Sequence, residues 1–102
     1  MGVNHVKLLA LDELLGEPMS FASLLRTIRE TDEYTQAGLA KKLGVSKAHI
    51  CDLEKQRKFV SAERAARFAN KLGYSEALFV RVALQDQVNE AGLDYQVHVG
   101  AA

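Results

Sequence analysis

A single residue separates the end of one predicted helix from the start of the next, near the middle of the chain. Gly44 is expected to end a helix, because glycine adopts the left-handed closing conformation without steric cost. Ser46 is expected to begin one, because a serine hydroxyl accepts hydrogen bonds from the free amides of a first helical turn. Only Val45 lies between them. Two helices must therefore meet at a sharp turn, which constrains the fold more than any other feature.

Similar signals divide the rest of the chain into short helices. Apolar side chains recur at helical spacing after each expected cap. The expected caps are Ser20, Thr35, Ser46, Ser61 and Ser75. Gly44, Gly73 and Gly92 are the expected stops, and the helix after Ser46 is predicted to end at about Lys55. These signals predict an all-α fold of five helices over residues 20–91, preceded by an N-terminal extension, residues 1–19, with a weaker helix over residues 3–15.

The helical spacing also predicts which side chains face the core. One side of each predicted helix is apolar. The inward positions are Phe21, Leu24, Leu25, Ile28, Leu39, Ala40, Leu43, Ile50, Leu53, Ala65, Phe68, Ala69, Leu72, Leu78, Phe79, Val82 and Val88.

The C-terminal tail, residues 92–102, has a different pattern. Apolar and polar residues alternate from Leu93 to Val99, which predicts a short β-strand. A lone strand cannot satisfy its own backbone groups, so we expect it to pair with the same strand of a second copy in a homodimer. The alternative is a loosely docked tail.

Composition limits the kinds of protein that this chain can be. A length of 102 residues suits one domain with a modest core. Cys51 is the only cysteine, which excludes an intrachain disulfide and fits a reducing cytosol. The chain has no apolar run long enough to span a membrane and no secretion signal, so a cytoplasmic location is expected.

Charge is distributed unevenly although the formal net charge is zero. Residues 36–71 carry nine basic and three acidic side chains, whereas residues 1–35 carry three and six, and residues 72–102 carry one and four. A basic middle segment between acidic ends is the kind of local field that attracts a polyanion. Two helices joined by a glycine turn, with basic residues outside, make the arrangement in which the second helix enters the major groove of DNA.

The mixed chemistry of the second helix of this pair invites a metal or catalytic interpretation. His49 and Cys51 are two residues apart, so they point about 200° apart on a helix and do not readily hold one ion. His49 and Asp52 are close enough to touch, but zinc needs three or four ligands. Cys51 has no adjacent base on its face. We therefore predict no metal, no cofactor and no enzymatic activity.

The stretch from Thr35 to Lys55, TQAGLAKKLGVSKAHICDLEK, resembles the lambda-repressor-like, or XRE-type, helix-turn-helix family. The shared pattern is Thr/Ser-Gln, then Leu-Ala, then Leu-Gly-Val-Ser, then Ile-x-x-Leu-Glu. Lys55-Gln56 departs from it, because the family often has Asn-Gly there. The resemblance implies a five-helix DNA-binding domain.

Site residues follow from this resemblance. It implies base contacts by Lys47, Ala48 and Asp52, with His49 and Cys51 as neighbours that are candidates for further contacts. It implies phosphate contacts by Gln36, Ser46 and Lys55, with Arg57 and Lys58 continuing the basic loop. It also implies a structural salt bridge between Arg29 and Glu54.

The expected function is sequence-specific binding of double-stranded DNA. Small members of this family resemble repressors and the autorepressing antitoxins of toxin–antitoxin modules, which implies a cognate toxin as a possible partner. The alternative is a protein-interaction adaptor that keeps the fold without binding DNA, because Ala48 and Cys51 offer few hydrogen bonds.

Overall fold

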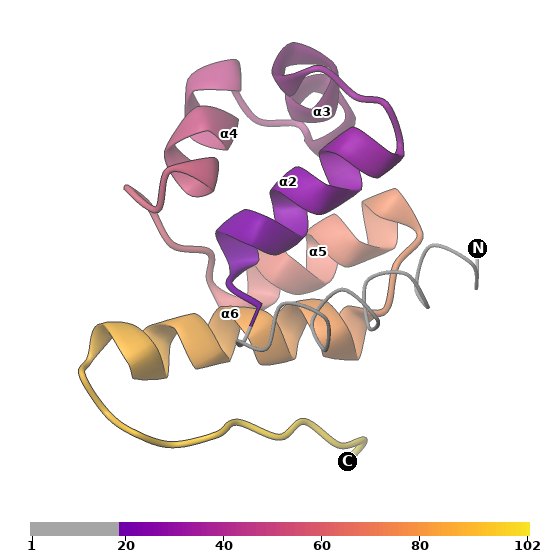
Figure 1. Cartoon of the computed structure of the whole chain (residues 1–102). Helices are drawn as coiled ribbons and strands as arrows, with labels where there is room; N and C mark the ends of the chain where they lie inside the picture. Colours follow the sequence, from indigo (N-terminus) through magenta and orange to yellow (C-terminus); the bar gives the residue numbers. More distant parts are fainter. Residues whose placement is uncertain (1–18) are drawn as a thin grey trace.

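The computed structural model describes residues 19–102, which form five α-helices. Figure 1 shows them in chain order: α2 (Phe21–Thr31), α3 (Gln36–Leu43), α4 (Lys47–Glu54), α5 (Ala62–Leu72) and α6 (Glu76–Glu90). The all-α prediction is confirmed for this part of the chain. The weaker helix predicted over residues 3–15 lies outside the described residues.

Each of the five helices begins where its cap predicts. The side chains of Ser20, Thr35, Ser46, Ser61 and Ser75 all accept a hydrogen bond from an amide in the first turn that follows. Gly44 and Gly73 take the left-handed conformation, with φ of 74° and 77°, and close α3 and α5. The helix predicted to end at about Lys55 ends one residue earlier, at Glu54, and Lys55 is its C-cap.

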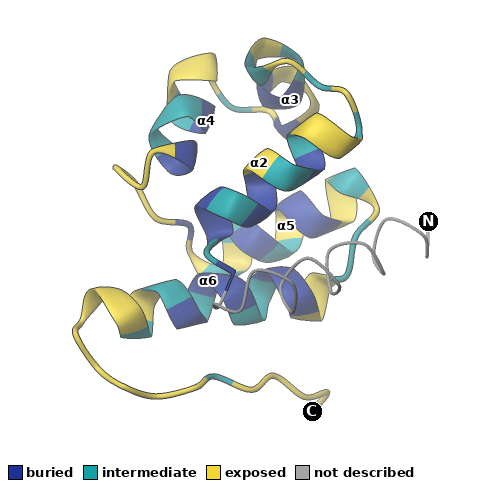
Figure 2. Cartoon of the chain, viewed as in Figure 1, coloured by how far each residue is buried: buried dark blue, intermediate teal, exposed yellow. Residues whose placement is uncertain are grey.

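The core lies where the inward faces of the helices meet (Figure 2). The positions predicted to face inward are buried, except Leu72 and Val88, which are half-buried. Phe79 is fully buried and contacts two rings, Phe21 edge-on at 5.6 Å and Tyr74 in a stacked arrangement at 6.1 Å. Met19, which was assigned to the extension, is also buried in this core.

The helices pack in a way that leaves one side of α4 free. α5 lies against α6, and α2 packs on both α4 and α6. α3 packs on α4 and α5. The pair α3 and α4 therefore sits at the end of the molecule opposite α6, as Figure 1 shows.

The prediction of a β-strand over Leu93–Val99 is wrong. Within residues 19–102 the structure contains no β-strand, and the tail runs as an extended segment beneath α6 (Figure 1). The side chain of Gln85 takes the place of a neighbouring strand: its Nε2 donates to the Tyr95 carbonyl at 2.8 Å, and the Val97 amide donates to its Oε1 at 2.8 Å. A tail that finds its backbone partners on a helix side chain has no need of a β-ladder.

None of the helices between residues 19 and 102 is long and apolar enough to cross a membrane.

Candidate nucleic-acid interface

The turn between α3 and α4 is closed by backbone hydrogen bonds. The Val45 amide donates to the Ala40 carbonyl at 3.0 Å, and the Gly44 amide donates to the Lys41 carbonyl at 3.3 Å. From α5, the Lys71 ammonium donates to the Leu43 carbonyl at 3.1 Å. Val45 is half-buried and packs against the core. The turn is therefore held by α3, by Lys71 of α5 and by the packing of Val45.

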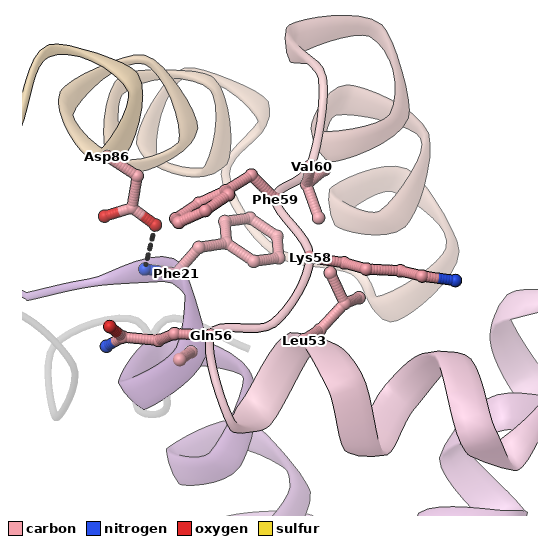
Figure 3. Close-up of a pocket in the computed structure, with 8 residues that line it drawn as sticks. Phe21, Leu53, Gln56, Lys58, Phe59, Val60 and Asp86 are labelled. Atoms are coloured by element: carbon pink, nitrogen blue, oxygen red, sulfur yellow. Dashed lines mark hydrogen bonds between the residues drawn. The ribbon is translucent and has the colours of Figure 1, made fainter. Parts of the chain in front are cut away.

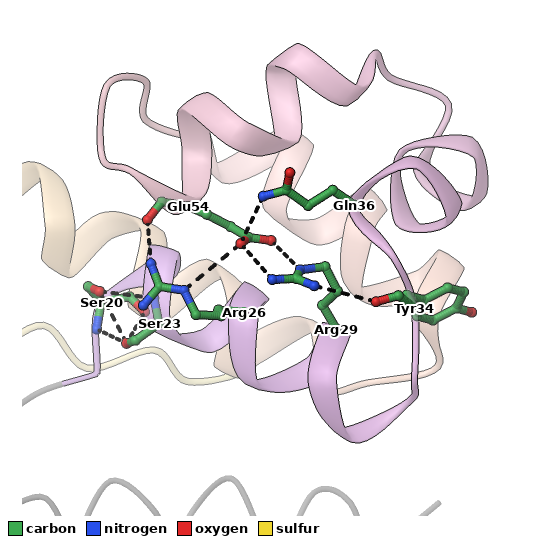
Figure 4. Close-up of polar contacts among 7 residues, drawn as sticks. All are labelled: Ser20, Ser23, Arg26, Arg29, Tyr34, Gln36 and Glu54. Carbon is green, nitrogen blue, oxygen red and sulfur yellow. Dashed lines mark hydrogen bonds and ion pairs between the residues drawn. The ribbon is translucent and has the colours of Figure 1, made fainter.

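The inner face of α4 is held by apolar packing and by one buried carboxylate. Ile50 and Leu53 are buried, and the Glu54 side chain is only 4% exposed. Arg29 of α2 donates to Glu54 twice, from Nε to Oε2 at 2.7 Å and from Nη2 to Oε1 at 3.1 Å (Figure 4). This is the pair that the family resemblance implies. Its parallel geometry is the strong form of an arginine–carboxylate contact.

Two further side chains complete this network, as Figure 4 shows. Arg26 donates from Nη2 to the Glu54 backbone carbonyl at 2.8 Å. Gln36, expected to contact a phosphate, lies with its Nε2 3.4 Å from Glu54 Oε1. The hydrogen bond with Glu54 raises the pKa of the Arg29 guanidinium, although burial acts in the opposite direction. The beginning of α3, the end of α4 and the last turn of α2 thus share one carboxylate.

The outer face of α4 carries the exposed residues of the predicted contact set. Ser46, Lys47 and Ala48 are exposed at the start of the helix. Lys55, Arg57 and Lys58 are exposed just after its end. The Ser46 hydroxyl already accepts from the His49 amide at 3.0 Å, so its first role is to cap the helix.

His49, Cys51 and Asp52 are half-buried, and each lies beside an arginine. His49 Nε2 is 3.2 Å from Nη1 of Arg64 on α5. Arg57 donates from Nε to Asp52 Oδ1 at 2.9 Å, and its Nη2 lies 3.7 Å from Cys51 Sγ.

The pKa of His49 reflects this crowded setting. Burial lowers the pKa of its imidazole, and the positive charges of Arg64 and Lys58 lower it further, against a smaller opposing effect of Asp52. The lowered pKa favours the uncharged imidazole at neutral pH, so the permanent positive charge on this part of the surface comes from the neighbours of His49.

Three basic residues of α5 extend this surface and were not predicted as site residues. Arg64, Arg67 and Lys71 line a hollow of about 210 Å³ beside Gly44 and Val45. They are three and then four residues apart, which places them on one face of a helix. This spacing is the feature of the sequence that could have identified them. What the sequence did not show is that this face lies against the α3–α4 turn.

Residues 19–102 contain no group of three or more His, Cys, Asp or Glu side chains able to hold a metal ion. The hollow in Figure 3, between α2, the loop after α4 and α6, has a volume of about 10 Å³, enough for about one water molecule. Within it Asp86 accepts from the Phe21 amide at 3.0 Å, and burial raises the pKa of the Asp86 carboxyl.

Comparisons with known proteins agree with this geometry. Residues 20–81 match a family model described as "Helix-turn-helix domain". The chain is also similar to a solved structure described as a hypothetical transcription factor, NHTF, from Neisseria. That likeness has 18% sequence identity, covers 70% of this chain and 79% of the other, and has a TM-score of 0.54. At this identity the likeness shows a shared fold. None of the curated proteins compared with this chain matches it.

Proposed function

The chain belongs to the helix-turn-helix domain family, and on that basis we propose that it binds double-stranded DNA with α4 in the major groove. The observation that carries the proposal is the two-sided character of α4. Its inner side is fixed to α2 and the core through Ile50, Leu53 and Glu54, while Lys47 and Ala48 are exposed at the end that would enter the groove.

Charge placement supports the same orientation. Lys55, Arg57 and Lys58 follow α4, and Arg64, Arg67 and Lys71 lie on α5 beside the turn. Lysine and arginine on both sides of a reading helix contact phosphates and set its position on the duplex. Lys47 suits O6 and N7 of a guanine, and the Ala48 methyl suits the methyl group of a thymine. His49, Cys51 and Asp52, which are half-buried, are proposed at the edge of this reading surface.

The proposed role is that of a cytoplasmic transcriptional regulator, acting as a repressor or as an autorepressing antitoxin. The solved structure with the same fold is described as a hypothetical transcription factor. A cognate toxin encoded by the adjacent reading frame would identify the antitoxin role, and a frame with no toxin would favour a stand-alone repressor.

A homodimer is part of the proposal, because two reading helices related by a two-fold axis would recognise two half-sites one helical turn apart. The exposed apolar side chains of the tail, Leu93, Tyr95 and Val99, are the proposed contact with the second copy. Light scattering should give the mass of a dimer for the full chain and of a monomer after deletion of residues 93–102. A monomer mass for the full-length chain would contradict the proposed homodimer.

Selection of binding sites from random duplexes, followed by salt titration, tests DNA binding itself. We expect a selected sequence whose affinity falls steeply with salt, by about 0.9 logarithmic units per logarithmic unit of salt for each phosphate contacted. Lys55→Ala should weaken all duplexes and make the salt dependence shallower by about one contact. Lys47→Ala should change which sequences are preferred.

Arg81→Ala is the matched control, because Arg81 is the only basic residue of α6, at the opposite end of the molecule. It removes the same charge without touching the proposed interface, so affinity should change little. If no duplex is retained even at low salt, the protein-interaction adaptor becomes the better explanation.

A further inference from the structure

Asp52 and Arg57 form a charged pair at the outer face of α4. Asp52 lies in the last turn of α4, and Arg57 lies in the loop that follows. Arg57 Nε donates to Asp52 Oδ1 at 2.9 Å, and the Lys58 ammonium is 3.7 Å from Asp52 Oδ2. Both oxygens of the carboxylate therefore already have a cationic neighbour.

Backbone conformation brings this arginine back to the helix. Gln56 takes the left-handed conformation, with φ of 60°, and this reverses the chain after α4. The Arg57 amide then donates to the Asp52 carbonyl at 2.8 Å, and the Lys58 amide to the same carbonyl at 3.4 Å. The loop is thus folded onto the last turn of α4, and the Arg57 guanidinium is held over the reading face.

The remaining nitrogens of Arg57 point to its role. Among residues 19–102 no hydrogen bond or ion pair engages Nη1, and Nη2 has only the weak acceptor Cys51 Sγ at 3.7 Å. The Arg57 side chain is 57% exposed, against 25% for Asp52. A guanidinium fixed through Nε still offers both terminal nitrogens, the pair that reads O6 and N7 of guanine.

We propose that Arg57 reads a guanine in the major groove and that Asp52 is a positioning residue that orients its guanidinium. This inference rests on the proposed DNA binding and revises two expected roles. Asp52 does not contact a base itself, because its two carboxylate oxygens face Arg57 and Lys58. Arg57 does not serve as a phosphate contact. Cys51 Sγ lies 3.7 Å from Arg57 Nη2, so this thiol packs against the guanidinium.

Variants at the pair test the proposal, with the selected duplex and duplexes altered at single base pairs as probes. Arg57→Ala and Asp52→Ala should each reduce discrimination at the same G·C base pair, by about 5- to 150-fold. The double variant should lose little more discrimination than either single variant, because the two substitutions remove the same interaction. The pair is exposed enough that its loss should leave the fold intact, which circular dichroism checks.

A duplex with 7-deazaguanine at that position provides a second measurement. It lacks the N7 acceptor, so the wild-type protein should bind it more weakly, while Arg57→Ala should not distinguish it from the normal duplex. Lys58→Ala is the matched control: it removes the other cation near Asp52 and should weaken all sequences alike.

Three results would overturn the inference. Arg57 would be a phosphate contact if Arg57→Ala weakened binding to selected and scrambled duplexes equally and made the salt dependence shallower. Asp52 would be a reader itself if Asp52→Ala changed the preference at a base pair that Arg57→Ala left intact. Both of these leave wild-type DNA binding in place. Failure of the wild-type protein to retain any duplex at low salt would overturn the proposed function together with this inference.

Discussion

Arg29 and Glu54, which are 25 residues apart in the chain, are joined by two parallel hydrogen bonds of 2.7 and 3.1 Å. The carboxylate comes from the last residue of α4, and the guanidinium from the last turn of α2. The position of the proposed reading helix is therefore linked to a helix that lies outside the helix-turn-helix pair. Any change that loosens this link should affect both stability and DNA affinity.

Replacing Arg29 by methionine should be strongly destabilising. Arg29→Met leaves the Glu54 carboxylate buried and without its strongest partner, and breaking a buried pair in this way costs about 3 kcal/mol of the free energy of unfolding. Urea unfolding measures the loss. Glu63→Ala is the control, because it breaks the exposed pair between Glu63 and Arg67 and should cost no more than about 0.5 kcal/mol. Equal effects of the two variants would show that the buried pair has no special weight.

Two positions with left-handed backbone should respond to substitution in opposite directions. Gly44 has φ of 74° at the α3–α4 turn, and Gln56 has φ of 60° after α4. Gly44→Ala should destabilise by about 1–2 kcal/mol, because a side chain is strained there and the added Cβ would lie 3.3 Å from the Lys71 ammonium. Gln56→Gly should stabilise by about 0.5 kcal/mol, since relief of strain exceeds the greater chain entropy lost on folding. Thermal unfolding of both variants would check the opposite signs; destabilisation by Gln56→Gly would contradict the strain argument.

His49 should make stability depend on pH in mildly acidic solution. Burial, with Arg64 and Lys58 nearby, lowers the pKa of the folded imidazole, whereas the unfolded residue binds a proton near pH 6.5. Below that pH the unfolded state binds more protons than the folded state, so the free energy of unfolding should fall as the pH decreases through this window. His49→Gln should flatten this part of the curve. NMR titration of the His49 ring gives the pKa directly, and an unchanged or raised value would contradict the prediction.

Asp86 should show the opposite behaviour at lower pH. Burial raises the pKa of its carboxyl, so the folded state keeps its proton at pH values where the unfolded state has lost it. Stability from this group should decrease as the pH rises from the ordinary range of an aspartate through the raised pKa. Asp86→Asn keeps an oxygen for the Phe21 amide without the buried charge, so it should be at least as stable as wild type at pH 7. The advantage should disappear in acid.

Asp86→Ala separates the charge from the hydrogen bond. It leaves the first amide of α2 without its acceptor, and the loss of a helix-start partner costs about 1 kcal/mol. Destabilisation by asparagine as large as by alanine would show that the charge itself stabilises α2.

Local signals in the sequence predicted most of the fold. Each helix start follows a serine or threonine whose hydroxyl caps it, and this chemistry acts over three or four residues. Contacts between residues far apart in the sequence could not be predicted in this way. The Phe21 amide meets Asp86, which is 65 residues away, and His49 meets Arg64 only because α5 packs beside the turn. The Arg29–Glu54 pair was expected because of the family resemblance.

The wrong strand prediction has the same origin. Alternating residues from Leu93 to Val99 describe an extended chain correctly, but the pattern does not show what its backbone binds. Here the partner is a glutamine on α6, a residue type that helical spacing does not distinguish from any exposed polar residue. The arrangement of the proposed readers and phosphate contacts likewise depends on the fold of the loop after α4, in which Gln56 takes the left-handed conformation.

Gln85 should control the order of the tail with little effect on global stability. Gln85→Ala removes both hydrogen bonds to the backbone of Tyr95 and Val97, so the Val97 amide should exchange with solvent much faster. The Ile28 and Phe79 amides, in the core helices, should keep their protection. Hydrogen exchange followed by NMR measures both. An unchanged exchange rate at Val97 would mean that other contacts hold the tail.

The attachment of the tail to Gln85 also has a consequence for the register of the tail. Residues two apart in an extended chain present the same backbone groups in the same direction, so the Gln85 amide would be satisfied equally if the tail slid by two residues. What prevents such a slip is the length of the connection: Gly92, with φ of 73°, reverses the chain directly after α6 and leaves only two residues before Tyr95. Insertion of two residues after Gly92 would therefore offer the tail a second, equivalent registration, in which the carbonyl of Leu93 takes the place now held by that of Tyr95.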